Sequence, residues 1–160
     1  VATANEVVSI NNKATAAMTA KDYSKAVEIL KAGYAKHPES GALKRNLAAA
    51  LNNTGLTALN AQQYDKALDI FQQALALNPD SKPARGNIAI VHYNSGLSAL
   101  KVAKLPEAES SLKLAMQEFE ASGNQTLLTK AANNYAVVLK KLGKDDEAKA
   151  IQEKYSVAGI

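Results

Sequence analysis

Four asparagines recur along the chain at a nearly constant interval, and they are Asn12, Asn53, Asn94 and Asn134. A carboxamide side chain donates and accepts hydrogen bonds at the same time, so it can satisfy both the N–H and the C=O of an extended peptide backbone. Because the interval is nearly constant, we expect one such asparagine in each of four related structural repeats.

Residues that typically catalyse reactions or bind metals show no comparable pattern. His37 precedes Pro38 and is predicted to end a helix, while His92 is predicted to pack on one, and neither has a carboxylate at metal-ligand spacing. The acidic run 145–147 is typical of a charged helix start, and no serine or threonine lies in a G-x-S-x-G context. The sequence therefore predicts no enzyme activity, catalytic residue, cofactor or metal site.

Composition favours a helical body with a core of small aliphatic residues. Hydrophobic residues make up 47% of the 160 positions, but aromatic residues only 5%, and tryptophan and cysteine are absent. Small side chains suit helices that approach each other closely. The lack of cysteine excludes a disulfide framework, a thiolate metal site and a cysteine nucleophile.

The chain begins with Val1, and its sequence contains no apolar run of the roughly 18 residues that a membrane span requires. A start at valine suits either a processed mature protein or a fragment of a longer chain. We therefore expect a soluble protein whose location stays open. It is cytoplasmic or, if Val1 follows a cleaved signal, periplasmic or exported.

A related ten-residue stretch accompanies each asparagine interval. The four copies read KDYSKAVEIL, QQYDKALDIF, KLPEAESSLK and GKDDEAKAIQ, and their shared alanines are Ala26, Ala67, Ala108 and Ala148. Three serines keep the same step along the chain, and these are Ser40, Ser81 and Ser122. A periodic chain of this kind typically builds a stacked helical solenoid.

Helical periodicity and end signals predict the elements. Apolar residues in 64–77 recur at steps of three and four, which places them on one helix face. His37-Pro38 and Asn78-Pro79 should end helices, because the residue before proline leaves the α region, and the recurring serines are suitable N-caps. We expect eight helices at about 5–20, 23–36, 41–61, 64–77, 82–103, 106–121, 124–142 and 145–156, with short antiparallel connections.

With these positions aligned, the chain resembles the tetratricopeptide repeat family over nearly its whole length. Counted from Val7, Ala48, Ala89 and Thr129, the family's small residue at position 8 is Ala14, Gly55, Gly96 and Ala136, and the shared alanine occupies position 20. The resemblance implies an all-α fold, a right-handed α-solenoid of four antiparallel helix-turn-helix repeats. These repeats, at about 5–38, 41–79, 82–121 and 124–156, would form a single domain over residues 1–160.

The repeats depart from the family in length. The usual repeat has about 34 residues, whereas the repeat of this chain has about 41 residues. The additional seven, about two helical turns, fall in GALKRNL and PARGNIA. We therefore expect helices 41–61 and 82–103 to project beyond their hairpin partners. The first repeat is expected to have no room for these turns.

In this family the first helix of each repeat lines a concave groove. Transferring the family's groove positions gives the expected peptide-binding residues Asn12, Thr15, Asn53, Leu56, Asn60, Asn94, Leu97, Lys101, Lys130, Asn134 and Lys141, with the apolar Val8, Ala49, Ile90 and Val137 on the same helices. The arrangement is similar to the asparagine ladders of family members that bind extended peptides. The alternative is that each asparagine bonds to a neighbouring helix.

The net charge of +4 is distributed unevenly. No acidic residue lies between Glu120 and Asp145, whereas four lysines do, namely Lys130, Lys140, Lys141 and Lys144. This end of the groove should attract an acidic partner segment, although a solvated helix face is the alternative. Nucleic-acid binding requires a denser basic stripe or stacking aromatic residues and is not expected.

Two functions therefore remain open from the sequence. The first is a protein–protein interaction scaffold that binds a peptide or protein segment in the concave groove. The second is a structural or self-assembling element of a larger complex, in which projecting turns or exposed ends form a homo-oligomer.

Overall fold

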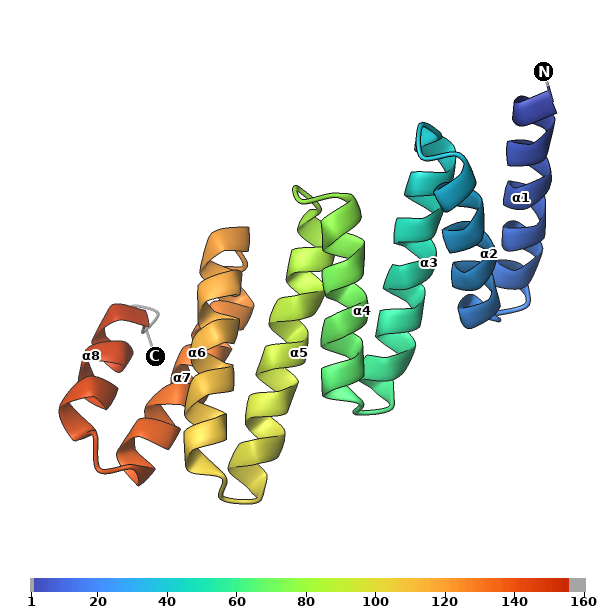
Figure 1. Cartoon of the computed structure of the whole chain (residues 1–160). Helices are drawn as coiled ribbons and strands as arrows, with labels where there is room; N and C mark the ends of the chain where they lie inside the picture. The colour runs from blue at the N-terminus through green and yellow to red at the C-terminus, as the bar shows by residue number, and fades with distance from the viewer. Residues whose placement is uncertain (1, 156–160) are drawn as a thin grey trace. The chain divides into compact units, whose positions relative to one another are not determined.

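The structure, a computed structural model, describes residues 2–155, and within this range it consists of eight helices without strands (Figure 1). The helices are α1 (Ala2–Thr19), α2 (Tyr23–Lys36), α3 (Gly41–Asn60), α4 (Tyr64–Leu77), α5 (Lys82–Lys101), α6 (Leu105–Ser122), α7 (Gln125–Lys141) and α8 (Asp145–Tyr155). The predicted all-α class and the predicted order of helices are confirmed. The expected end of the last helix at residue 156 lies outside the described residues.

The turn inside each helical hairpin has the same hydrogen bond in all four repeats. A backbone N–H donates to the carbonyl five residues earlier, at 2.9 Å in each case, and the pairs are Asp22–Ala17, Gln63–Ala58, Lys104–Ala99 and Lys144–Leu139. This bond is a common way to satisfy a carbonyl at the end of a helix. Because it returns at the interval of the asparagines, the sequence repeat is also a repeat of backbone conformation.

One residue in each of these turns has a left-handed backbone. The φ angles are 59° at Lys21, 58° at Gln62, 57° at Ala103 and 75° at Gly143. Glycine adopts this conformation without strain, whereas it costs other residues roughly 1–2 kcal/mol. Three of the four turns therefore carry local strain that the surrounding hydrogen bonds maintain.

The shared alanine of each repeat is the first fully buried residue of the second helix. Ala26, Ala67, Ala108 and Ala148 are all 0% exposed. Each donates its N–H to the carbonyl of the residue that closes the preceding turn, for example Ala67 to Gln63 at 2.9 Å. A larger side chain here would separate the helix from its neighbours, which explains why alanine recurs.

The helix ends between repeats follow the predicted proline and serine signals in the first half of the chain. α2 ends at Lys36 and α4 at Leu77, immediately before His37-Pro38 and Asn78-Pro79. The Ser40 hydroxyl accepts from the Leu43 N–H, and the Ser81 hydroxyl from the Ala84 N–H, both at 3.3 Å. These predictions are confirmed.

The prediction that Ser122 caps the next helix is wrong. Ser122 is the last residue of α6, and its hydroxyl donates to the Phe119 carbonyl at 3.1 Å. Gly123, at φ 71°, ends the helix, and the Asn124 side chain accepts from the Leu127 N–H at 3.1 Å. Because this connection ends with glycine and not with proline, α6 continues further and the cap moves two residues along the chain.

The first helices are longer than their hairpin partners, as expected, but the differences in length are not the expected ones. α3 has 20 residues against 14 in α4, and its added turns bury Leu43 and Leu47. α5 also has 20 residues but exceeds α6, with 18, by only two, because α6 extends to Ser122. α1 has 18 residues, so the expectation that the first repeat lacks room for these turns is wrong.

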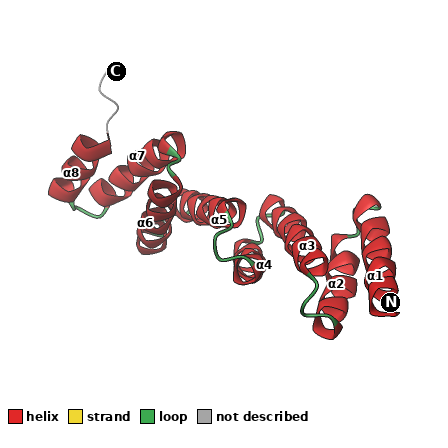
Figure 2. Ribbon diagram, turned by 90° about the horizontal axis from the view of Figure 1, so that it is seen from above, coloured by secondary structure: helices red, strands yellow, loops and turns green. Residues whose placement is uncertain are grey.

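Contacts divide the chain into two compact parts, an N-terminal unit of residues 1–84 and a C-terminal unit of residues 85–160. In the N-terminal unit, α1 contacts α2 and α3, α2 contacts α3, and α3 contacts α4. In the C-terminal unit, α6 contacts α7 and α7 contacts α8. Figure 2 shows the short loops that join consecutive helices within each unit. A single domain over all 160 residues stays a prediction.

Three glycines let the two helices of a hairpin approach each other. The first is Gly33 of α2, where a Cβ atom would lie 2.6 Å from the Ile10 side chain of α1. A Cβ atom at Gly55 of α3 would lie 2.6 Å from a ring carbon of Phe71 in α4. A Cβ at Gly96 of α5 would lie 2.7 Å from the Leu112 side chain in α6. The predicted small positions are therefore the points where paired helices touch.

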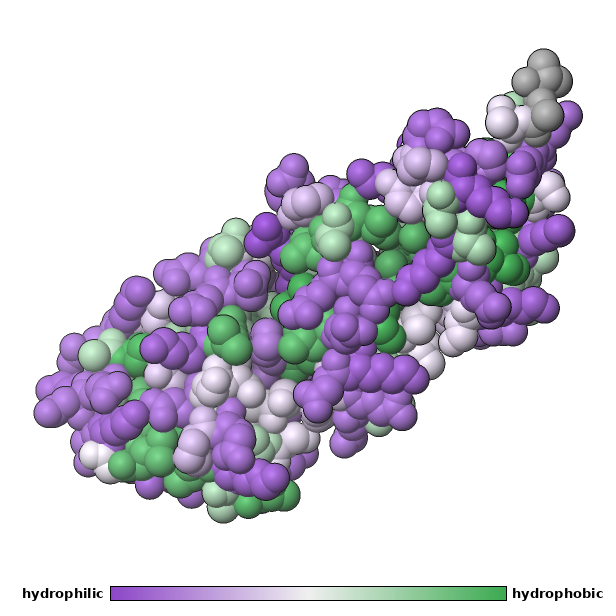
Figure 3. Space-filling view, in the orientation of Figure 1, coloured by the Kyte–Doolittle hydropathy of each residue, from purple (hydrophilic) through white to green (hydrophobic). Residues whose placement is uncertain are grey.

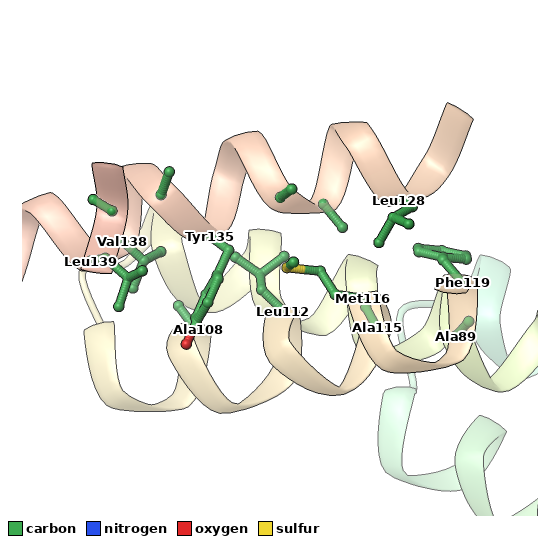
Figure 4. Packing of buried hydrophobic residues seen from close by; sticks show 14 residues of the cluster. Ala89, Ala108, Leu112, Ala115, Met116, Phe119, Leu128, Tyr135, Val138 and Leu139 are labelled. Carbon is green, nitrogen blue, oxygen red and sulfur yellow. The ribbon is translucent and has the colours of Figure 1, made fainter. Parts of the chain in front are cut away.

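The core of the C-terminal unit lies mainly between α6 and α7 (Figure 4). Its larger buried side chains are Leu112, Met116 and Phe119 from α6, and Leu128, Tyr135, Val138 and Leu139 from α7. Tyr93 of α5 packs edge-to-face on Phe119, with ring centroids 6.2 Å apart. This packing fixes α7, and thereby determines which α7 side chains face outward.

Candidate functional site

All eleven predicted site residues lie on the first helix of a hairpin. The N-terminal unit carries Asn12 and Thr15 on α1 and Asn53, Leu56 and Asn60 on α3; the C-terminal unit carries Asn94, Leu97 and Lys101 on α5 and Lys130, Asn134 and Lys141 on α7. Each of them is exposed or half-buried. The residues on α1 and α3, together with Val8 of α1, are called the N-terminal surface. The residues on α5 and α7, together with Val137 of α7, are called the C-terminal surface.

The N-terminal surface has its two helices joined by a pair of half-buried amides. Asn46 of α3 donates through Nδ2 to Oδ1 of Asn11 of α1 at 2.7 Å. The repeat interval does not reveal this pair, because the two residues do not belong to the regular asparagine series. The bond helps to hold α1 beside α3, which positions the residues of the surface.

The recurring amides of the N-terminal surface have no side-chain partner among the described residues. Asn12 is exposed and Asn53 half-buried, and neither carboxamide takes part in a hydrogen bond in this part of the chain. The Thr57 hydroxyl donates to the backbone carbonyl of Asn53 at 3.0 Å and leaves the amide available. Both carboxamides therefore retain their capacity to donate and accept.

Exposed aliphatic side chains are concentrated on the first helices. Among residues 2–155, five large hydrophobic side chains are exposed: Val8 (56%), Leu56 (36%), Val102 (66%), Leu114 (41%) and Val137 (43%). Three of them, Val8, Leu56 and Val137, belong to the two surfaces. On the face that Figure 3 shows, hydrophilic residues predominate and hydrophobic residues appear in smaller patches.

Each of these three aliphatic residues lies one helical turn from a recurring asparagine. Val8 precedes Asn12 by four residues, and Leu56 follows Asn53 by three. Residues at these spacings are neighbours on a helix face. Val137 has the same relation to Asn134, so an apolar group and an amide lie side by side on α1, α3 and α7.

Asn134 differs from the other asparagines because its amide N–H groups are already engaged. Nδ2 donates to the Tyr93 hydroxyl of α5 at 3.2 Å and to the Lys130 carbonyl at 3.0 Å. It therefore joins α5 to α7, as in the alternative considered for the whole asparagine series. Its Oδ1 has no partner among the described residues and can still accept.

The lysines of α7 are exposed, whereas the neighbouring Lys144 is paired with a carboxylate. Lys130, Lys140 and Lys141 are at least partly exposed, and α7 contains no acidic residue. Lys144 donates to Glu109 Oε1 at 2.7 Å, and this hydrogen bond raises the pKa of the Lys144 ammonium. The free positive charge of this region therefore belongs to α7 itself.

The two histidines have structural surroundings. His37 is buried, with Nε2 3.2 Å from Glu6 Oε2 and Nδ1 3.6 Å from Glu39 Oε1. Sequence spacing did not reveal Glu6, because α1 supplies it. Burial lowers the pKa of the half-buried His92, and the Glu118 carboxylate partly offsets this shift. Within residues 2–155, no group of three or more histidine, aspartate or glutamate side chains is arranged to hold a metal ion.

The helices within residues 2–155 also include none with the length and apolar character of a membrane-spanning segment.

Comparisons with known sequences identify the repeat. Two family models, both described as tetratricopeptide repeat, match residues 48–81 and 129–155. The first match covers α3 from Ala48 onward and α4, and the second covers most of α7 and α8. Among curated protein sequences, none matches the chain.

The solved structures that match the chain share little sequence with it. The aspartyl phosphate phosphatase F from Bacillus subtilis has 20% identity and a TM-score of 0.50, and the match covers 94% of this chain and 39% of that one. The apo form of RapI has 18% identity and a TM-score of 0.48, and the match covers 94% of this chain and 42% of that one. MamA protein has 14% identity and a TM-score of 0.39, and the match covers 98% of this chain and 99% of that one. The chain thus spans about two fifths of the first two proteins. The similarity to the phosphatase concerns the helical fold alone.

Proposed function

Because this chain belongs to the tetratricopeptide repeat family, we propose that it is a protein-interaction scaffold that binds an extended segment of another protein along its first helices. The observation that carries this proposal is the placement of Val8, Leu56 and Val137. These exposed aliphatic side chains lie one turn from recurring asparagines. A surface that pairs apolar groups with amides suits a polypeptide, which offers both side chains and a polar backbone.

The N-terminal surface supplies the chemistry for backbone recognition. The carboxamides of Asn12 and Asn53 would donate to a carbonyl and accept from an N–H of the bound segment. Val8 and Leu56 would contact its side chains and remove apolar area from water. Because most of these contacts would be made to the backbone, the surface would read few side chains of its partner.

A double substitution tests this role. In Asn12→Ala/Asn53→Ala, the loss of about two neutral hydrogen bonds, each contributing about 0.5–1.5 kcal/mol, should weaken partner binding by about tenfold or more. The assay is co-purification of partners from the source organism, followed by titration of the captured partner. The midpoint of thermal unfolding should hardly change, because neither amide has a partner in the described structure.

The matched control is Gln72→Ala, which removes an exposed amide from α4, a second helix. This variant should bind like the unsubstituted protein. Equal partner binding by the double variant and the control would contradict the proposed function.

Self-association is a second candidate, favoured by a pocket at the α1–α2 hairpin. The pocket has a volume of about 450 Å³ and is lined by Lys13, Ala16, Ala17, Ala20, Asp22, Lys25 and Ile29. Its lining combines small apolar side chains with charged ones and would accept part of a second copy. Light scattering should then show a mass that rises with concentration and falls back in Ala20→Glu. A monomer at every concentration would remove this candidate.

A further inference from the structure

One face of α7 combines positive charge with an apolar centre. Lys130, Asn134, Val137 and Lys141 are separated by four, three and four residues, so they lie along one side of the helix. Both lysines are exposed, Val137 is 43% exposed and Asn134 is half-buried. We call these four residues the α7 strip.

No carboxylate of the described chain neutralises this strip. α7 has no acidic residue, and neither Lys130 nor Lys141 forms an ion pair with any described residue. The nearby Glu109 is occupied by Lys144, at 2.7 Å. The charge of the strip is therefore available to a ligand of opposite sign.

The apolar centre favours a polypeptide ligand over a nucleic acid. Single-stranded nucleic acids bind to basic surfaces through aromatic side chains on which the bases stack. The aromatic residue of α7, Tyr135, points into the core against α6 (Figure 4) and is 6% exposed. Val137 instead offers an aliphatic contact, which suits an aliphatic side chain of a peptide.

The register of the strip determines the spacing of a matching ligand. At 1.5 Å per residue, Lys130 lies about 10 Å from Val137 along the helix, and Val137 lies about 6 Å from Lys141. An extended peptide advances about 3.3 Å per residue. Side chains on one side of an extended chain are separated by an even number of residues, and the long lysine side chains can absorb a mismatch of a few ångströms. These intervals therefore correspond to about four and two residues of an extended chain.

We propose that the α7 strip binds an extended acidic segment with the pattern acidic–x–x–x–aliphatic–x–acidic. The two carboxylates pair with Lys130 and Lys141, and the aliphatic side chain packs on Val137. Asn134 Oδ1 accepts from a backbone N–H of the segment, while its own N–H groups stay on Tyr93 and Lys130. This inference rests on the proposed function and specifies the partner of the C-terminal surface.

A labelled synthetic peptide tests the pattern directly. The probe is Asp-Ser-Ser-Ser-Leu-Ser-Asp with Gly-Ser at both ends, and binding to the full chain is measured by fluorescence anisotropy. Lys130→Gln/Lys141→Gln should weaken binding about fivefold or more. Val137→Ser should weaken it as well, and so should replacing the peptide's leucine by serine. Raising the salt should reduce binding by the unsubstituted protein.

The matched control is Lys104→Gln/Lys113→Gln, which removes the same charge from exposed positions before and within α6. It should change peptide binding less than about twofold. Circular dichroism melts of all variants verify that they fold.

Several outcomes would overturn the inference, and three of them concern the controls. These are a control variant that loses as much binding as the strip variant, a peptide of scrambled order that binds as well as the probe, and an oligothymidylate of equal charge that binds more tightly. Asn12→Ala/Asn53→Ala should leave the probe bound, because it changes the other unit. Loss of partner binding in that variant, with no effect of the strip variant on the probe, would refute the strip and retain the proposed function.

Discussion

Ala103 holds a left-handed backbone in the turn between α5 and α6, at φ 57°, where the fourth hairpin has Gly143. Because glycine adopts this conformation without the Cβ clash, Ala103→Gly should stabilise the protein by about 0.5–1 kcal/mol despite the larger entropy of the unfolded chain. Urea unfolding followed by circular dichroism measures the change.

Two controls separate this effect from a general effect of glycine. Gly143→Ala should destabilise by a similar amount, because it introduces the same clash at φ 75°. Ala150→Gly, at an exposed position within α8, should cost about 1 kcal/mol. A loss of stability in Ala103→Gly would show that the turn does not keep its left-handed residue.

His92 should make stability depend on pH. Burial lowers the pKa of its imidazole in the folded state, so the unfolded chain binds the proton more readily. The stability that neutral His92 contributes is therefore fully present above the usual histidine pKa. It is lost as the pH falls from there toward the lower pKa of the folded state. When the pH is lowered from about 7.5 to about 5, the free energy of unfolding should fall less for His92→Gln than for the unsubstituted protein. Urea unfolding at each pH measures this change. Parallel curves for the two proteins would contradict this prediction.

At the scale of helices, a glycine sets the tight contact of the α3–α4 hairpin and of the α5–α6 hairpin. Gly55→Ala would place a Cβ 2.6 Å from Phe71, and Gly96→Ala would place one 2.7 Å from Leu112. Each change should cost about 1–3 kcal/mol through overpacking, measured by urea unfolding. Gly86→Ala is the control, because its Cβ meets nothing within 4 Å, and it should add about 1 kcal/mol of helix propensity. Equal losses at all three glycines would refute the contact argument.

The asparagines should divide into a structural and a binding group. Asn134→Ala removes the link to Tyr93 and should destabilise the chain by about 1 kcal/mol, whereas Asn53→Ala should change stability little. A double-mutant cycle with Tyr93→Phe should give a coupling energy between positions 93 and 134. Additive effects of these two changes would show that the hydrogen bond contributes nothing to stability.

The sequence predicts helices well where side chains act on their own backbone. Pro38, Pro79, Ser40 and Ser81 determine helix ends locally, so their positions reveal the boundaries. The prediction of an N-cap at Ser122 was wrong because the neighbouring Gly123 ends α6 with a left-handed backbone. The left-handed turns were also missed, because three of them lack the glycine that would signal them.

At the scale of the whole chain, stability should be local to each unit. Leu30 and Leu112 are both 0% exposed, one in each unit. Leu30→Ala should cost about 2–5 kcal/mol and should accelerate amide hydrogen exchange mainly in α1–α4. Leu112→Ala, its counterpart, should accelerate exchange mainly in α6–α8. Uniform acceleration by either variant would show that the chain opens as one domain.

The candidate site was only partly accessible from the sequence for a similar reason. The resemblance placed all eleven residues on first helices, and the structure has them exposed or half-buried there. It gave no sign that the chain divides after Ala84, because the repeat interval continues unchanged through this point. Nor did it separate Asn134 from Asn12 and Asn53, because that difference depends on a partner, Tyr93, from another helix.

The added turns of α3 also bear on how such a chain can change in length. Seven residues advance a helix to about 20° short of two full rotations, so Leu43 and Leu47 have nearly the same phase as the buried face that follows them. An insertion of five residues would turn the added segment by more than a third of a rotation and expose its leucines. A helix of this kind can therefore be lengthened only by steps close to whole turns if its buried face is to stay continuous. The repeat of this chain corresponds to the family's usual length plus one step of seven residues, or nearly two turns.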